Sequence, residues 1–294
     1  MTSYSPDATF LDLSAKALEK FPPELLECTK LTTLIIGGSF ETLPEDIWKM
    51  VSLRKLIVGG RTFKSLPHTI SRLVNLEELR VSGQLETLPA TIGNMSNLRW
   101  LDISNNRFTS LPEAICNLSN LRELRCSHNR LTHLPNNLHK LTKLTALYCY
   151  SNQLSTLPPM FERLTKLRHI RLNNNKFGIF PHALTQITNL YELHINNNRI
   201  RYIPPEISQL AYLGVLVLHS NPITTLPKTL CQKSRPVTID AWNITFTHLP
   251  QELAEMRDTI HCHNTLKFGD DGLTDEEIDI EIMKLLERRR PQNE

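Results

Sequence analysis

The residues most able to act as nucleophiles, bases or metal ligands in this chain are its cysteines and histidines. No two of the six cysteines lie at the short spacing of a metal-binding pair. Cys126 and Cys149 lie at equivalent points of a repeating pattern, where an apolar residue is expected. We therefore predict small core thiols. The alternative, a thiol nucleophile with a histidine base, is disfavoured because His128 and His169 fall on positions that face elsewhere.

One cluster has the composition of a metal site, the run His261, Cys262 and His263. If this run is a strand, as we expect, both histidines point to one side and the cysteine to the other, so the three cannot converge on one ion. The sequence thus predicts no metal, no cofactor and no catalytic residues.

The elements that position these residues follow from an internal repeat. A representative copy runs from Leu121 to Leu141, and similar units follow one another at intervals of 22 or 23 residues. The units begin at Leu31, Leu53, Leu76, Leu98, Leu121, Leu144, Leu167, Leu190 and Leu213. No such unit can bury its apolar face alone, so the repeat predicts a stack of coils.

Each unit has two halves. The first half alternates leucine with polar residues, which indicates a short half-buried strand, and stacked strands would pair in parallel. The second half contains an apolar-proline pair, such as Leu111 and Pro112, followed by apolar residues at helical spacing. Because proline suits the first turn of a helix, this half predicts a short helical return.

An asparagine marks the corner after the strand in six units. Its amide can satisfy the backbone groups of its own coil and of the neighbouring coil, so we assign it a structural role. These residues are Asn106, Asn129, Asn152, Asn175, Asn198 and Asn221.

The resulting pattern, LxxLxLxxNxLxxLPxxI, resembles the leucine-rich-repeat family, specifically its LP-containing class of 23 residues, over residues 8 to 256. The resemblance implies an α/β solenoid, a right-handed arc whose parallel β-sheet lines the concave face and whose short helical or 3-10 segments form the convex face. Members similar to this class include Ras-pathway scaffold proteins of animals, plant intracellular relatives and bacterial effectors. The resemblance therefore implies binding of a protein partner on the concave face.

Departures from the pattern set the expected domain limits. We expect an N-terminal degenerate repeat or cap over residues 1–30, nine regular units over 31–235, a degenerate repeat and last strand over 236–268, and a C-terminal capping helix with a basic tail over 269–294. The helix, opening at the capping box that starts at Thr274, either covers the end of the core or docks a second partner.

Three early units carry glycine in place of the corner asparagine, at residues 37–38, 59–60 and 83. Glycine tolerates positive φ and close backbone approach, so we expect these corners to turn differently and to form a stacked rim. The alternative, a phosphate cradle, lacks the lysine and the helix start of a nucleotide-binding loop.

Polar strand positions between the leucines would face the concavity and form the binding surface. Tryptophan, tyrosine and arginine dominate the energies of protein interfaces, and several occur here. The alternative is that the rings stack along the sheet and only stabilise it. The candidate partner-binding residues are Arg80, Trp100, Asp102, Arg125, Tyr148, Tyr150, His169, Arg171, Asn173, His194, Asn196 and His219.

These residues predict a non-catalytic scaffold or adaptor, a monomer, that binds a protein with an acidic centre, with some sensitivity to pH below about 6.5 from its histidines. A net charge of +3 without a basic cluster disfavours nucleic acid, and the lack of a secretory signal or long apolar run favours a cytoplasmic protein that binds no membrane. The resemblance also allows a bacterial effector that binds a host protein after delivery without a classical signal peptide. The alternative from another class, the substrate-recognition part of a ubiquitin-ligase-type effector, would need a catalytic domain, and only 38 residues follow Met256.

Overall fold

The computed structural model describes residues 4–247 and 249–262, together with residues 277, 280 and 284. The chain divides into two compact units, Met1–Asn152 and Gln153–Glu294. Both are built from the same coil, in which a strand is followed by a corner, a 3-10 helix and a return to the next strand.

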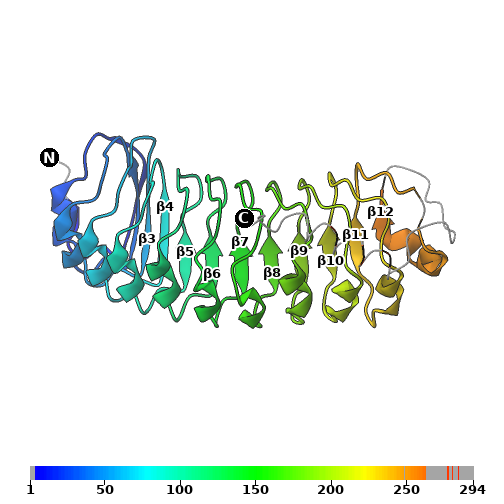
Figure 1. Cartoon of the computed structure of the whole chain (residues 1–294). Coiled ribbons are helices and arrows are strands. Elements are labelled where there is room, and N and C mark those ends of the chain that lie inside the picture. Colours follow the sequence, from blue (N-terminus) through cyan, green and yellow to red (C-terminus); the bar gives the residue numbers. More distant parts are fainter. Residues whose placement is uncertain (1–3, 248, 263–276, 278–279, 281–283, 285–294) are drawn as a thin grey trace, which may run out of the picture. The chain divides into compact units, whose positions relative to one another are not determined.

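In the first unit, seven strands pair in parallel, each with the next in the chain (Figure 1). They are β1 (Phe10–Leu18), β2 (Thr33–Gly38), β3 (Lys55–Gly59), β4 (Glu78–Ser82), β5 (Trp100–Asp102), β6 (Glu123–Arg125) and β7 (Ala146–Tyr148). The 3-10 helices between them are η1 (Pro23–Glu27), η2 (Glu45–Lys49), η3 (His68–Arg72), η4 (Ala90–Asn94), η5 (Glu113–Asn117) and η6 (Leu138–Lys140).

The second unit continues the pattern with five parallel strands paired in chain order. They are β8 (His169–Arg171), β9 (Glu192–His194), β10 (Val215–Val217), β11 (Thr238–Asp240) and β12 (Ile260–His261). Its 3-10 helices are η7 (Phe161–Arg163), η8 (His182–Gln186), η9 (Pro205–Gln209), η10 (Lys228–Gln232) and η11 (Gln251–Thr259).

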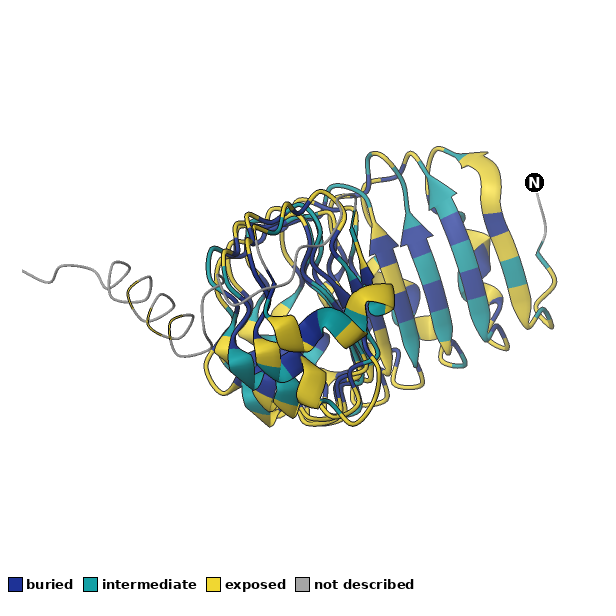
Figure 2. Cartoon of the chain, turned by 90° about the vertical axis from the view of Figure 1, so that its right-hand side faces the viewer, coloured by how far each residue is buried: buried dark blue, intermediate teal, exposed yellow. Residues whose placement is uncertain are grey.

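The repeat therefore predicts the fold correctly, as an α/β solenoid with a parallel sheet on one side of each coil and short helices on the other. Along the strands of the first unit, buried residues alternate with more exposed ones (Figure 2). The core lies between the sheet and the helices, and leucines such as Leu56, Leu79 and Leu124 are fully buried in it.

The return segments are 3-10 helices, and most of the prolines lie just before them rather than in their first turn. Pro44 and Pro112, for example, are the N-cap residues of η2 and η5 and have extended backbone. After Pro135 the helix starts only at Leu138. Proline thus fixes the extended approach to the helix, because its φ is locked near the value this stretch needs.

The corner asparagines form the predicted ladder. Asn152 Nδ2 donates to the carbonyls of Cys149 and Tyr150 in its own coil and to that of Cys126 in the preceding coil, at 3.0 to 3.3 Å. Its Oδ1 accepts the backbone N–H of Leu131, also in the preceding coil, at 2.9 Å. One buried amide therefore ties two coils together.

The residue before each ladder asparagine has a left-handed backbone, which turns the chain out of the strand. The residues with positive φ at this place are Asn105, His128, Ser151, Asn174, Asn197 and Ser220. The early glycine corners turn differently, since no described glycine has a positive φ.

The early glycines instead allow close backbone approach. A Cβ on Gly38 would collide with the carbonyl of Leu18, and a Cβ on Gly60 would collide with that of Gly38. Strands β2, β3 and β4 also extend two or three residues further than β5 to β7. These glycines are explained by the packing of adjacent coils, without a phosphate site.

The predicted last strand is present as β12, and β11 precedes it in the degenerate repeat. The proposed C-terminal capping helix and its capping box fall mainly on residues outside the described part of the chain, as does His263. The domain limits stay a prediction.

We expect Asn152→Ala to destabilise the protein by about 3 kcal/mol, because it leaves a buried N–H and several buried carbonyls without partners. Urea unfolding followed by circular dichroism measures the change. Asn97→Ala is the control, since the exposed Asn97 amide makes a single bond, to the Val74 carbonyl, and its loss should cost less than about 0.5 kcal/mol. Equal effects of the two changes would contradict a structural role for the ladder.

Candidate functional site

The strand face is the side of the sheet that carries the polar strand positions, and the structure aligns them as the sequence predicts. In the first unit, Arg80, Asp102, Arg125 and Tyr148 stand in register across β4 to β7. In the second unit, Arg171 and His194 stand in register across β8 and β9. Of the twelve candidate residues, six lie in each unit.

Aromatic rings on the strand face of the first unit remain available to solvent. The side chain of Trp100, on β5, is 46% exposed. The Arg125 guanidinium lies over the Tyr148 ring, 5.0 Å from its centre, and the Tyr150 ring meets His128 edge-on at 5.0 Å. Stacking along the sheet therefore does occur, but it leaves nearly half of Trp100 exposed.

Carboxylates accompany the arginines of this face. Arg80 Nε donates to Glu78 at 2.5 Å, and Arg125 Nε donates to Glu123. Asp102 accepts the backbone N–H of Ser104 at 3.0 Å. The sequence places these glutamates in the neighbouring column but does not reveal that they pair with the arginines, and the pairs make the face less basic than its arginines alone suggest.

In the second unit, Glu192 is the centre of a network of charged groups. It accepts hydrogen bonds from Arg171 Nη2 at 2.7 Å and Nε at 3.1 Å, and lies 3.2 Å from His169 Nδ1 and 2.7 Å from His194 Nε2. Burial alone would raise the pKa of Glu192, but the bonds from Arg171 and His169 outweigh it and lower that pKa. Glu192 is therefore a carboxylate that holds three candidate residues in place.

The pKa of the neighbouring His194 is also lowered, but here burial is the largest cause. Burial lowers the pKa of His194, the charge of Arg171 lowers it further, and Glu192 only partly compensates. Near neutral pH this imidazole is uncharged and can donate its Nε2 proton to Glu192. His194 thus adds a hydrogen bond rather than a positive charge to the strand face.

Other candidate residues differ in how much surface they offer. Asn173 and His219 are half-buried, whereas Asn196 is only 7% exposed and gives a partner little side chain to contact. Neither the type of a residue nor its position in the repeat predicts this difference in burial.

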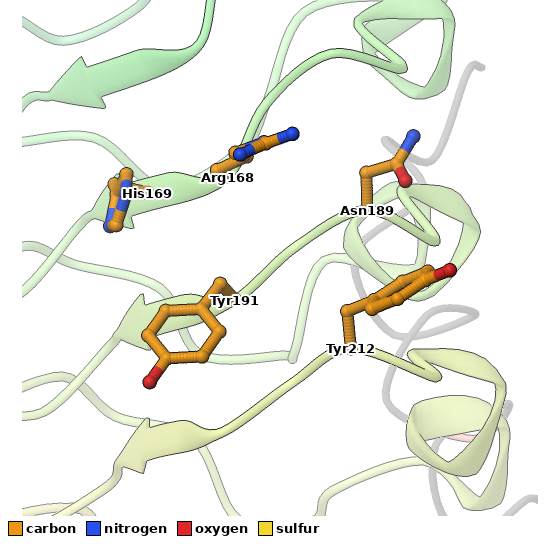
Figure 3. A pocket seen from close by; sticks show the side chains of 5 residues that line it. All are labelled: Arg168, His169, Asn189, Tyr191 and Tyr212. Carbon is orange, nitrogen blue, oxygen red and sulfur yellow. The ribbon is translucent and has the colours of Figure 1, made fainter.

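Sequence reasoning missed four residues just before the strands of the second unit, Arg168, Asn189, Tyr191 and Tyr212. Together with the predicted His169, they line an open pocket of about 560 Å³ (Figure 3). Four of them occupy positions that the repeat pattern leaves unspecified, so only the stacking of three coils brings them together.

The cysteines are placed as predicted. Cys126 and Cys149 are fully buried in adjacent coils with their sulfur atoms 3.2 Å apart. Burial raises the pKa of Cys149 well above its usual value, and the neighbouring Cys126 adds to the shift. Burial also raises the pKa of Cys116 to about 12, so neither Cys149 nor Cys116 is poised as a nucleophile.

Within the described residues, no group of three or more histidine, cysteine, aspartate or glutamate side chains is arranged to hold a metal ion. Over the same part of the chain, no helix has the length and apolar character needed to cross a membrane.

Comparison with known proteins identifies the class. The model of the leucine-rich repeat region matches residues 85–199, and the Leucine Rich Repeat model matches residues 189–210. This chain is a leucine-rich-repeat protein. Its assignment to the LP-containing 23-residue class stays a prediction. The family and its fold are generally non-catalytic modules for protein interaction.

Three solved structures illustrate the likeness. A leucine-rich-repeat protein of Leptospira interrogans is 25% identical, with a TM-score of 0.63, covering 95% of this chain and 88% of the other. The plant peptide hormone receptor RGFR1, in complex with RGF2, is 22% identical, with a TM-score of 0.65, covering 85% of this chain and 46% of the other. Toll of Drosophila, in its complex with Spatzle, is 21% identical, with a TM-score of 0.74, covering 90% of this chain and 38% of the other.

The chain therefore spans less than half of the length of the plant receptor and of Toll, and these two likenesses show the fold alone. A search of curated protein sequences gives no significant match.

We expect Glu192→Gln to lower stability by about 1 to 2 kcal/mol near neutral pH, since it weakens the bonds from Arg171 and the two histidines. The unfolded carboxyl takes up its proton near pH 4.5 and the folded one at lower pH, so the stabilisation is present above about 4.5 and is lost as pH falls through the lowered folded pKa. Unfolding at several pH values measures it, with the exposed Glu86→Gln as control. A difference between wild type and Glu192→Gln that persists in acid would contradict the role of the charge.

We expect iodoacetamide in mildly alkaline buffer to label the exposed Cys231 of the native protein first, and Cys116, Cys126 and Cys149 only after denaturation. Peptide mapping by mass spectrometry gives the order of labelling. Rapid labelling of Cys149 in the native state would show that this thiol is neither buried nor raised in pKa.

Proposed function

We propose that this chain is a non-catalytic binding module that holds a protein partner against its strand face, the face predicted to be concave. The observation that carries the proposal is the exposed Trp100, which stands in the same sheet as the ordered Arg125 and Tyr148 pair. A large exposed ring beside prearranged polar groups is typical of the residues that dominate interface energies.

The order of these groups also supports binding. Because Glu123 and Glu192 fix the guanidinium groups of Arg125 and Arg171, little side-chain entropy is lost when a partner contacts them. The complexes of Toll with Spatzle and of the plant receptor with RGF2 are consistent with the use of this fold in recognition.

The paired glutamates change the expected chemistry of the partner. A partner with an acidic centre would meet the arginines and also Glu123 and Glu192, so we propose a contact surface of mixed charge around an aromatic anchor. The monomeric state, the cytoplasmic location, the role of a bacterial effector and the alternative of a ubiquitin-ligase substrate receptor stay predictions from the sequence.

The test is a comparison of wild type with Trp100→Ala/Tyr148→Ala in capture from lysate of the cells that produce the protein. We expect at least one partner to bind the double variant about tenfold more weakly or worse, because loss of an interface anchor costs more than about 1.4 kcal/mol. Quantitative mass spectrometry and titration of the purified partner measure the change.

The matched control is Trp48→Ala, which removes a ring of η2, on the other side of the coil, where Arg72 stacks on it at 5.3 Å. A partner that is lost from the control and from the double variant alike, or from neither, would show that binding does not use the strand face.

A further inference from the structure

We infer that the pocket before the strands of the second unit binds the carboxylate of an acidic peptide segment. The pocket is the space of about 560 Å³ lined by Arg168, His169, Asn189, Tyr191 and Tyr212. It lies beside the strand face, and binding in the pocket does not require the proposed strand-face partner.

Arg168 supplies the charge that selects an anion. Its side chain is exposed, and among the described residues it makes no ion pair and no side-chain hydrogen bond. Arg54, which holds the equivalent place five repeats before it, is bound to Glu77 at 2.5 Å. Arg168 therefore presents a guanidinium fork whose donors are free for a carboxylate.

No acidic residue lines the pocket to compete for that fork. On the strand face, the carboxylate of Glu192 is taken up by Arg171, His194 and His169 Nδ1. Arg235 does not line the pocket, but its guanidinium lies 4.9 Å from the centre of the ring of Tyr212, one of the lining residues. The pocket is thus positive, and an anionic group complements it.

The two tyrosines give the pocket walls for the stem of a side chain. Tyr191 and Tyr212 are 51% and 48% exposed, and the Tyr191 ring meets His169 at 6.2 Å. Figure 3 shows these rings on one side of the opening and Arg168 with Asn189 on the other. The methylene groups of a glutamate can pack on the rings while its carboxylate reaches Arg168.

Gly214 keeps one of these rings in place. It takes the position that Arg168 and Tyr191 hold in the two preceding repeats, and a Cβ there would lie 2.9 Å from Cε2 of Tyr191. The absence of a side chain at this position lets the Tyr191 ring lie against the next coil. The pocket therefore depends on a cationic, an aromatic and a glycine residue in consecutive repeats.

A peptide fits better than a polynucleotide. Among the residues that line the pocket, Arg168 is the one arginine or lysine, whereas a nucleic acid strand is bound mainly by rows of cations along its phosphates. A single carboxylate on a flexible stem requires one guanidinium and an apolar wall, which the pocket supplies.

The experiment measures binding of a blocked tri-glutamate peptide to the full chain by calorimetry and by saturation-transfer NMR. We expect a dissociation constant on the order of 1 mM, as suits so short a probe, and binding about tenfold weaker in Arg168→Gln. Arg122→Gln is the matched control, because Arg122 holds the same repeat position in the first unit and is also exposed. It should bind as wild type does.

A second variant tests the wall without a change of charge. Gly214→Ala forces the Tyr191 ring to move, so it should weaken peptide binding while the melting temperature shows that the chain still folds. Unchanged affinity in both Arg168→Gln and Gly214→Ala would overturn the assignment.

Three other probes separate the sources of the signal. A blocked tri-glutamine peptide should not bind, and equal binding would refute the role of the carboxylate. Inorganic phosphate that competes as well as the peptide would reduce the pocket to a bare anion site and overturn the peptide assignment. A short single-stranded oligonucleotide that binds more tightly than the peptide would also overturn it. Every probe is synthetic and none is the strand-face partner. A negative result with these probes therefore does not affect the strand-face proposal, and loss of the strand-face partner in the other experiment does not affect the pocket assignment.

Discussion

The hydrogen bonds of the corner asparagines are the interaction on which the rest of the fold depends. The backbone must leave the sheet after three strand residues in each later coil, and this exposes carbonyls and N–H groups inside the protein. An unpaired buried backbone group costs about as much as a lost hydrogen bond, so such a corner needs a polar partner that fits between two coils. Asn129, Asn152 and Asn198 supply both a donor and an acceptor at that point.

The same constraint explains how the functional surface is built. Since the ladder fixes the spacing and register of successive strands, side chains 23 residues apart in sequence become neighbours on the sheet. The pairing of Arg125 with Tyr148, and of His169 with Glu192, follows from this register. The described core is mainly apolar, whereas the exposed strand positions differ in residue type from coil to coil.

Much of this fold could be predicted from the sequence because the repeat is a physical unit. The leucine spacing gives the strands, and the asparagine at fixed spacing gives the corner. The glycine corners were harder, because glycine permits both positive φ and close approach, and only the neighbouring carbonyls, such as that of Leu18 beside Gly38, decide between them. The site was predicted less completely. Columns of residue types identify Arg80 and Arg171 but not their carboxylate partners, and the pocket at Arg168 and Tyr191 arises from positions that the repeat leaves free.

The left-handed corner is still present in the coil after the last ladder asparagine. Asn243 still has positive φ, although the residue after it is Ile244, which cannot make the amide bonds that Asn221 makes one coil earlier. Each ladder amide bonds to its own coil and to the preceding coil. A complete coil is therefore the smallest segment that can be added or removed without breaking the ladder. Removal or duplication of a whole repeat would leave every corner with a matching neighbour, whereas an insertion of one residue would shift all later side chains out of line. Evolution of such a chain is therefore expected to proceed by gain and loss of entire repeats, with single substitutions tolerated best at exposed positions.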